Sequence, residues 1–236
     1  MTGVSHSVAM EWMAEGHEYF LTCLMSLTDE EVEGPSRLPG WTGKHLLSHV
    51  GHNARALGRL AHWAATGEET LMYPNPSARA AEIEAGAVWP VHRLRSFAVQ
   101  EQDRLTLLLG RIAADRWQAT VVTAQGRTVL ASAIPWLRSR EVWIHACDLP
   151  SGGDFDDFPG PFTDALIQDA VDRRRTAQGL DIDVHATNGG PQTGTAELMR
   201  VEGPAVDLAR WLTRGVVSPR LRTGAGDLPP QLPPWL

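Results

Sequence analysis

The 236-residue sequence has two cysteines, a single lysine and no long apolar run. Cys23 and Cys147 cannot form a disulfide framework, which favours a reducing, cytoplasmic location. No stretch reaches the roughly 18 apolar residues that a membrane span needs, and the N-terminus does not read as a secretory signal. The chain also has no basic excess, and its formal charge of -7 argues against nucleic-acid binding.

Sequence motifs that supply a catalytic nucleophile or bind phosphate are missing as well. The sequence contains no G-x-S-x-G elbow, no P-loop and no G-x-G-x-x-G after a predicted strand, which removes the usual machinery of hydrolases, NTPases and dinucleotide enzymes. A cysteine–histidine nucleophile pair is not favoured either. Cys147 follows His145 by two residues, about 200° around a helix, and Cys23 lies in an apolar helical row.

The first 150 residues are predicted to form a helical bundle. Apolar residues recur at helical spacing in four segments, 5–28, 41–65, 77–115 and 134–149. Pro90 should break the third segment, in which Leu105 and Leu107 to Leu109 are predicted to be buried. Residues 119–132 predict two short strands around Gln125-Gly126.

A segment rich in glycine, aspartate and proline, SGGDFDDFPGP, follows Pro150 and marks the predicted domain boundary. Helices and strands are expected to alternate beyond it, over 162–177, 182–186, 195–201, 204–213 and 220–222. This alternation predicts a small α/β domain over residues 151–236. Its proline-rich tail should be held on the surface by Trp235.

Nine histidines are the first candidates for a site. Five have no partner at a useful helical spacing and are interpreted as surface or partly buried polar residues: His6, His17, His62, His92 and His185. His45, His49 and His52 instead occur at i, i+4 and i+7 on one stripe of a predicted helix. The alternative for this stripe is a polar helix edge whose imidazoles hydrogen-bond locally.

A carboxylate and an imidazole share one face of the last predicted bundle helix. Glu141 and His145 are four residues apart, a turn of about 400°, which places them within about 6 Å of each other. With one histidine from a facing helix, they would form a His/His/Glu set with an open position, typical of catalytic zinc. The spacing is common in helices, however, and Glu141 could instead form an ion pair with Arg138.

Two segments, SLTDEEVEGPSRLPGWTGKHLLSHVGHNARAL and REVWIHACDL, resemble signatures of the mycothiol-dependent maleylpyruvate isomerase family. That family lies within the DinB-like superfamily of metal-binding helical bundles. A third segment, VEGPAVDLARWLTRG, resembles the end of the family's C-terminal α/β domain, so the resemblance spans nearly the whole chain. It implies a DinB-like four-helix bundle over residues 1–150, followed by a small C-terminal α/β domain over 151–236.

Carried over residue by residue, the resemblance places the family's metal site on His49, Glu141 and His145. His52 is the second choice for the position of His49. Asp148 matches a frequent family acid three residues after His145, and it could orient that imidazole. The ion implied is zinc or another divalent metal.

The resemblance also implies a reaction, the cis–trans isomerisation of maleylpyruvate to fumarylpyruvate in gentisate-type aromatic degradation. Reversible addition of a thiolate turns the double bond into a rotatable single bond. The thiol would come from mycothiol and lose its proton to metal coordination, which agrees with neither cysteine resembling a nucleophile.

The family further implies a catalytic arginine in the C-terminal domain. Arg214 is the first choice for this residue, and Arg220 and Arg222 are the alternatives. An arginine would bind the dianionic substrate and its developing enolate, so the active site is expected in the cleft between the two domains.

Two other functions remain open at this stage. A thiol S-transferase of the same superfamily would use the metal and the thiol without isomerisation. A non-catalytic metal-binding protein would keep the metal ligands and need no arginine. The expected partners are a small dicarboxylate substrate and a low-molecular-weight thiol, with no nucleic acid and no membrane. The sequence does not predict an oligomeric state.

Overall fold

The structure is a computed structural model that describes residues 4–193, 199–233 and 235. The chain forms two compact units, one over Ser5–Gly153 and the other over Asp154–Leu236. The predicted boundary after residue 150 lies three residues before this division. A helix with the length and apolar character for crossing a bilayer is not found among the described residues.

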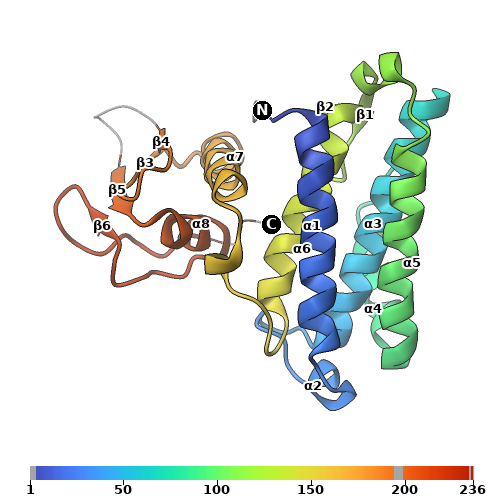
Figure 1. The fold of residues 1–236 in the computed structure, drawn as a ribbon, viewed down its shortest axis with the longest axis horizontal. Helices are drawn as coiled ribbons and strands as arrows, with labels where there is room; N and C mark the ends of the chain where they lie inside the picture. The colour runs from blue at the N-terminus through green and yellow to red at the C-terminus, as the bar shows by residue number, and fades with distance from the viewer. Residues whose placement is uncertain (1–3, 194–198, 234, 236) are drawn as a thin grey trace. The chain divides into compact units, whose positions relative to one another are not determined.

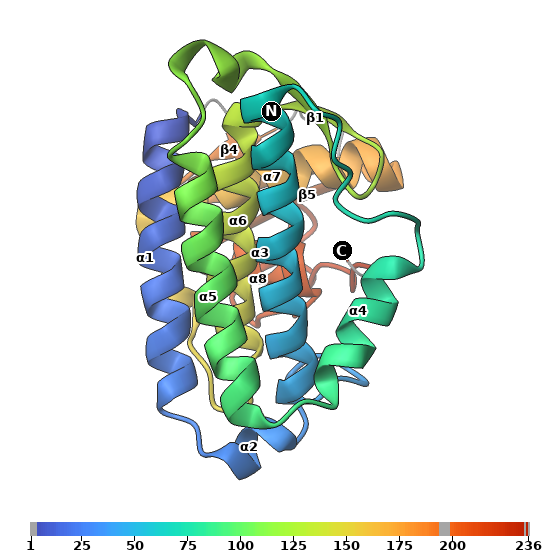
Figure 2. The ribbon, with the colours of Figure 1, turned by 90° about the vertical axis from the view of Figure 1, so that its right-hand side faces the viewer.

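Four long helices form the N-terminal unit, as the apolar periodicity predicts (Figure 1). They are α1 (His6–Met25), α3 (Gly43–Thr66), α5 (Val91–Leu109) and α6 (Ile134–Asp148). Helix α1 packs against α6, while α3 packs against both α5 and α6. Figure 2 shows the four helices running side by side. The predicted fold class, a helical bundle with a small sheet-containing C-terminal part, is confirmed.

Shorter elements connect the four helices. Helix α2 (Asp29–Glu33) precedes α3, and α4 (Ala78–Ala87) precedes α5, with Pro90 between α4 and α5 as predicted. Strands β1 (Thr120–Val122) and β2 (Thr128–Leu130) form an antiparallel hairpin. Its turn places Gly126 at a φ of 74°, a conformation that glycine adopts without strain. Short 3-10 turns cover Ala114–Gln118, Ala131–Ala133 and Phe155–Asp157.

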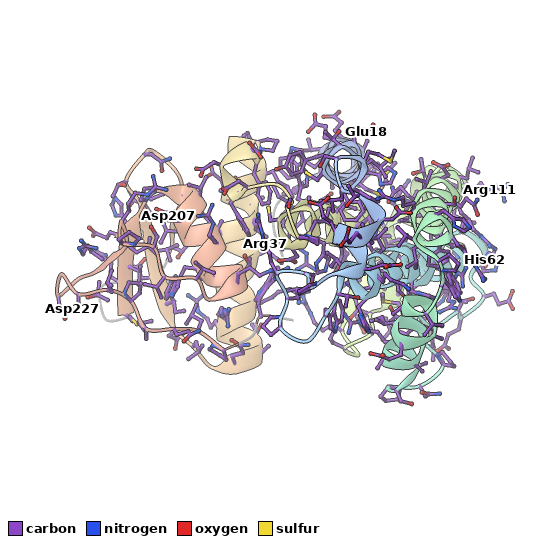
Figure 3. The ribbon with its side chains drawn as sticks, turned by 90° about the horizontal axis from the view of Figure 1, so that it is seen from below. Glu18, Arg37, His62, Arg111, Asp207 and Asp227 are labelled. Atoms are coloured by element: carbon purple, nitrogen blue, oxygen red, sulfur yellow. The ribbon has the colours of Figure 1, made fainter. Side chains whose placement is uncertain are left out.

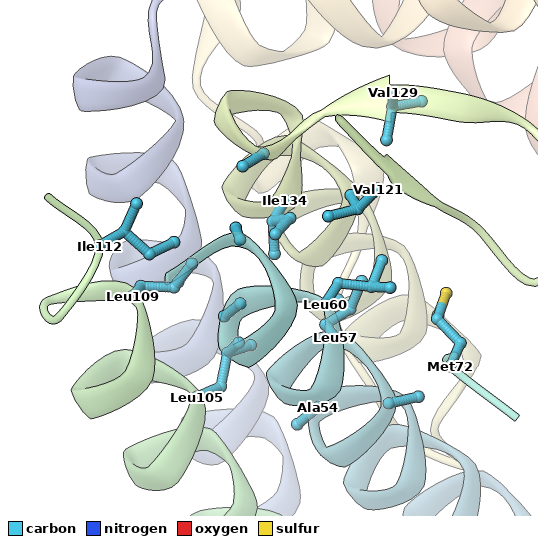
Figure 4. Close-up of a cluster of buried hydrophobic side chains, with 14 of the residues drawn as sticks. Ala54, Leu57, Leu60, Met72, Leu105, Leu109, Ile112, Val121, Val129 and Ile134 are labelled. Atoms are coloured by element: carbon cyan, nitrogen blue, oxygen red, sulfur yellow. The ribbon is translucent and has the colours of Figure 1, made fainter. Parts of the chain in front are cut away.

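A cluster of buried aliphatic side chains fills one end of the bundle (Figure 4). It joins α3, α5, the hairpin and the start of α6 through Ala54, Leu57, Leu60, Leu105, Leu109, Val121, Val129 and Ile134. The prediction that Leu107 is buried was wrong, because its side chain is 65% exposed. Two residues turn an α-helix by about 200°, so Leu105 and Leu107 cannot share the core face.

The C-terminal unit places two helices against a small mixed sheet. Helix α7 (Gly160–Gln178) leads into β3 (Ile182–Ala186) and β4 (Gln192–Thr193), and β5 (Met199–Gly203), α8 (Ala205–Arg214) and β6 (Arg222–Thr223) follow. The strand order is β4-β3-β5-β6, with β3 and β5 parallel and the other pairs antiparallel. Strand β4 was not predicted, and the start of the strand predicted at 195–201 lies outside the described residues.

The proline-rich tail is held on the C-terminal unit. The indole of Trp211 on α8 donates to the Pro230 carbonyl at 2.9 Å, and Arg174 donates to the Pro233 carbonyl at 2.7 Å. Trp235 is buried, with the guanidinium of Arg173 5.6 Å from the centre of its ring. The tail is therefore fixed by hydrogen bonds to main-chain carbonyls as well as by Trp235.

The interpretation of His17, on α1, as a surface or partly buried residue was wrong. Its side chain is buried rather than at or near the surface, with 8% exposed. Burial, together with the charge of Arg138, lowers the pKa of His17 to about 4. The folded protein therefore holds His17 in its neutral form at neutral pH.

This depressed pKa predicts a loss of stability in mild acid. In the unfolded chain the pKa of histidine is about 6.5, so the unfolded state takes up the proton first as the pH falls. The stabilising contribution of neutral His17 is complete above pH 6.5 and is lost as the pH falls toward 4. Between pH 7 and 5 we expect wild type to lose about 2 kcal/mol more unfolding free energy than His17→Gln. Urea unfolding at both pH values measures this difference, and equal pH dependence in the two proteins would contradict it.

Candidate metal centre

Helices α3 and α6 bring three of the predicted residues together. His49 Nε2 lies 2.9 Å from Glu141 Oε2 and 3.1 Å from His145 Nε2, and His145 Nε2 lies 3.3 Å from Glu141 Oε2. These three atoms form a triangle whose sides match the spacing, about 3.3 Å, that tetrahedral zinc with bonds near 2.0–2.1 Å imposes on its ligands. The donor set therefore fits one divalent ion, with a coordination position left open.

Burial and hydrogen bonding set the charges at this triangle. Burial lowers the pKa of His49 to about 4. Burial alone would raise the pKa of Glu141, but hydrogen bonds from His145 and His49 outweigh it and lower that pKa well below its usual range. The carboxylate is thus ionised and His49 is neutral at pH 7, which are the forms that bind a metal.

Asp148, at the end of α6, orients His145 through the ring nitrogen that does not face the triangle. The Nδ1–H of His145 donates to Asp148 Oδ2 at 2.8 Å, and the Asp148 side chain is buried. With the hydrogen on Nδ1, the Nε2 atom keeps its lone pair for a metal. Burial acts to lower the pKa of His145, but the hydrogen bonds to Asp148 and Glu141 raise it overall.

The other two histidines of the α3 stripe face other neighbours. His45 turns back to the start of the helix, where its Nδ1 accepts from the backbone N–H of Thr42 at 3.2 Å. His52 is buried, and its ring centre lies 4.7 Å from that of Phe97 on α5. His52 is rotated about 60° around the helix axis from His49. The structure therefore brings His49, and not His52, to the triangle.

Glu141 does not form the ion pair with Arg138 that was the alternative interpretation. Arg138 is fully buried and donates to the Val50 carbonyl at 2.9 Å, Asn53 Oδ1 at 2.9 Å and Gln102 Oε1 at 2.8 Å. These bonds connect α6 to α3 and α5. Because Arg138 is used in this way, the Glu141 carboxylate is available to the two histidines.

Three residues near the triangle were missed by sequence reasoning. Arg79 on α4 places Nη2 3.4 Å from His49 Nδ1, and the ring of Trp41 lies 5.5 Å from that of His49. Burial raises the pKa of Tyr73 to about 12, with Arg79 and Glu141 acting on it electrostatically. Trp41 begins the predicted helical segment 41–65, Arg79 lies near the start of the segment 77–115, and Tyr73 lies between them. Nothing in their spacing connects these residues with His49, so no pattern in the sequence indicated them.

The C-terminal arginines have different local contacts. Arg214, in the last turn of α8, donates to the Thr213 carbonyl at 3.1 Å. Arg220 pairs with both oxygens of Asp207, at 2.8 and 2.6 Å (Figure 3 labels Asp207). Arg222 donates to two backbone carbonyls. Arg220 therefore already has a carboxylate partner.

The fold and the site together define the class of this protein. It is a helical bundle that holds a buried His/His/Glu cluster, a candidate metal site, and is followed by a small α/β unit. The family model "Mycothiol maleylpyruvate isomerase N-terminal domain" matches residues 13–150. The chain therefore belongs to this family, as the sequence resemblance predicts.

Solved structures agree with the family model. The crystal structures of a mycothiol-dependent maleylpyruvate isomerase and of its histidine-to-alanine variant each match at 32% identity. Each match covers 98% of both chains with a TM-score of 0.89. No curated protein sequence matches the chain.

The geometry predicts which histidine holds a metal. Protein purified without added metal should contain about one equivalent of zinc, as a three-ligand open site implies. His49→Ala should lose most of it, whereas His52→Ala should keep it, because the His52 ring packs against Phe97. Elemental analysis of the three proteins measures this. Unchanged zinc in His49→Ala would show that the ligand set is wrong.

Proposed function

We propose that this chain is a mycothiol-dependent cis–trans isomerase that converts maleylpyruvate to fumarylpyruvate in gentisate-type aromatic degradation, in the cytoplasm. The observation that carries the proposal is the His49–Glu141–His145 triangle. It occurs in a chain that matches a mycothiol-dependent maleylpyruvate isomerase over 98% of both lengths. Zinc and mycothiol are the cofactors in this proposal.

The residues of the triangle suit this reaction. In the reaction, a C–S bond forms at the cis double bond and breaks again after rotation, so no atom is gained or lost. Zinc, when bound, would lower the pKa of the cofactor thiol. His49, Glu141 and His145 would hold the ion and leave one tetrahedral position for the thiol. Asp148 would keep the His145 ring in place during turnover.

The chain's own cysteines do not supply this thiol. Cys147 is buried on α6, with its Sγ 3.8 Å from the carbonyl of Trp143, one turn earlier on the same helix. Cys23 is partly buried on α1, a helix that carries none of the three proposed ligands. These positions support a thiol that comes from outside the protein.

The direct test is to incubate the zinc-loaded protein with mycothiol and maleylpyruvate and to follow fumarylpyruvate by chromatography. We expect conversion that requires mycothiol, with the Cys23→Ser/Cys147→Ser double variant within a few-fold of wild type. Accumulation of a stable thioether instead would identify an S-transferase. Absence of any turnover in protein that holds a full equivalent of zinc would favour a non-catalytic metal-binding protein.

A cation from the C-terminal unit is a further part of the proposal. The substrate carries two carboxylates, and arginine binds carboxylates through a planar fork. We propose Arg214 as this residue, with Arg220 and Arg222 as alternatives. Replacing the acting residue by alanine should lower kcat/KM by about two to three orders of magnitude and leave the zinc content unchanged. If each of the three alanine variants stays within a few-fold of wild type, the C-terminal unit supplies no catalytic cation.

A further inference from the structure

The two histidines of the triangle differ in what their second ring nitrogen meets. His145 donates from Nδ1 to the carboxylate of Asp148, the usual arrangement for a metal-binding histidine. His49 Nδ1 instead accepts from Arg79, whose Nη2 lies 3.4 Å away. A neutral histidine that uses Nε2 as a metal ligand carries its hydrogen on Nδ1, and a guanidinium has donors only. With a metal on His49 Nε2, two donors would therefore face each other, and both would need a new acceptor.

The acids nearest to Arg79 along the chain are engaged elsewhere. Glu82 on the same helix lies 3.5 Å from Arg59, and Glu84 lies 3.5 Å from His45. Within the described parts of the chain, no carboxylate oxygen lies within ion-pair distance of Arg79. The Arg79 side chain is exposed, so its guanidinium is accessible to a ligand from solvent.

The position of Arg79 follows from how α4 is fixed on α3. Ser48 Oγ donates to the Ile83 carbonyl at 2.8 Å. At Gly86 the two helices approach so closely that a Cβ atom would lie 2.2 Å from Ser48 Oγ. Arg79 occupies the first turn of α4, where the positive end of the helix opposes a cation. The local stability of α4 therefore gives no reason for an arginine at this place.

We propose that Arg79, together with the Nδ1–H of His49, binds a carboxylate of the substrate. This inference rests on the proposed function and adds a substrate-binding cation within the helical bundle itself. The charges agree in sign, because the carboxylates of Glu141 and Asp148 offset a divalent ion and Arg79 then adds one positive charge. One carboxylate of the substrate would balance that charge. A carboxylate would also supply the acceptor that both donors would lack once a metal is bound.

Calorimetric titration of maleate, a cis-dicarboxylate, into the zinc-loaded protein without thiol tests this subsite. We expect Arg79→Gln to raise the Kd of maleate at least about tenfold, the scale of one charge-assisted bidentate contact. Arg104→Gln is the matched control. Arg104 is exposed on α5 and makes no ion pair with another described residue, so this change removes the same charge elsewhere in the bundle. Its Kd should stay within about twofold of wild type.

All three proteins should hold equal zinc, which shows that the variants fold and keep the triangle. A Kd for Arg79→Gln within about twofold of wild type, or no saturable binding of maleate by wild type, would overturn the subsite. The titration contains no thiol and measures no turnover, so its outcome is separate from that of the isomerase assay. Arg79-dependent binding of maleate in a protein that does not isomerise maleylpyruvate would reject the proposed function and retain the subsite.

Discussion

The packing of α3 against α6 is the contact on which the candidate site depends. His49 lies 92 residues before Glu141 in the sequence, yet the atoms that face each other are 2.9 Å apart. Arg138 stabilises this contact, because it reaches from α6 to Val50 and Asn53, which follow His49 on α3. A buried cation one turn before Glu141 therefore fixes the spacing of the two helices where the ligands project.

Burying a carboxylate is costly unless its charge is balanced. Glu141 is placed between two imidazoles, and Asp148 supports one of them through its other nitrogen. Burial lowers the pKa of His49 to about 4. Burial also acts to lower the pKa of His145, but the hydrogen bonds to Asp148 and Glu141 raise it overall. Contacts with both imidazoles therefore offset the cost of burying the Glu141 carboxylate.

Helical spacing alone indicates the burial of His17 and the exposure of Leu107, although both were predicted otherwise. His17 is four residues after Met13 and three before Phe20, and both of these are buried. That spacing places His17 on the core face of α1, although its lack of a polar partner suggested the surface. Leu107 is the opposite case. It was assigned to the core because it lies in a run of leucines, but the helical period places its side chain on the exposed face.

The sequence by itself determined the helices, the break at Pro90 and the alignment of Glu141, His145 and Asp148, because spacing within one helix fixes direction around its axis. Only the tertiary structure decided which histidine of α3 joins them. His45, His49 and His52 differ by rotations of about 20° to 60°, and which of these directions meets α6, α5 or the helix start depends on how the helices pack. The approach of Arg79 was likewise decided by the docking of α4, because no local pattern records which side chains from separate helices will meet.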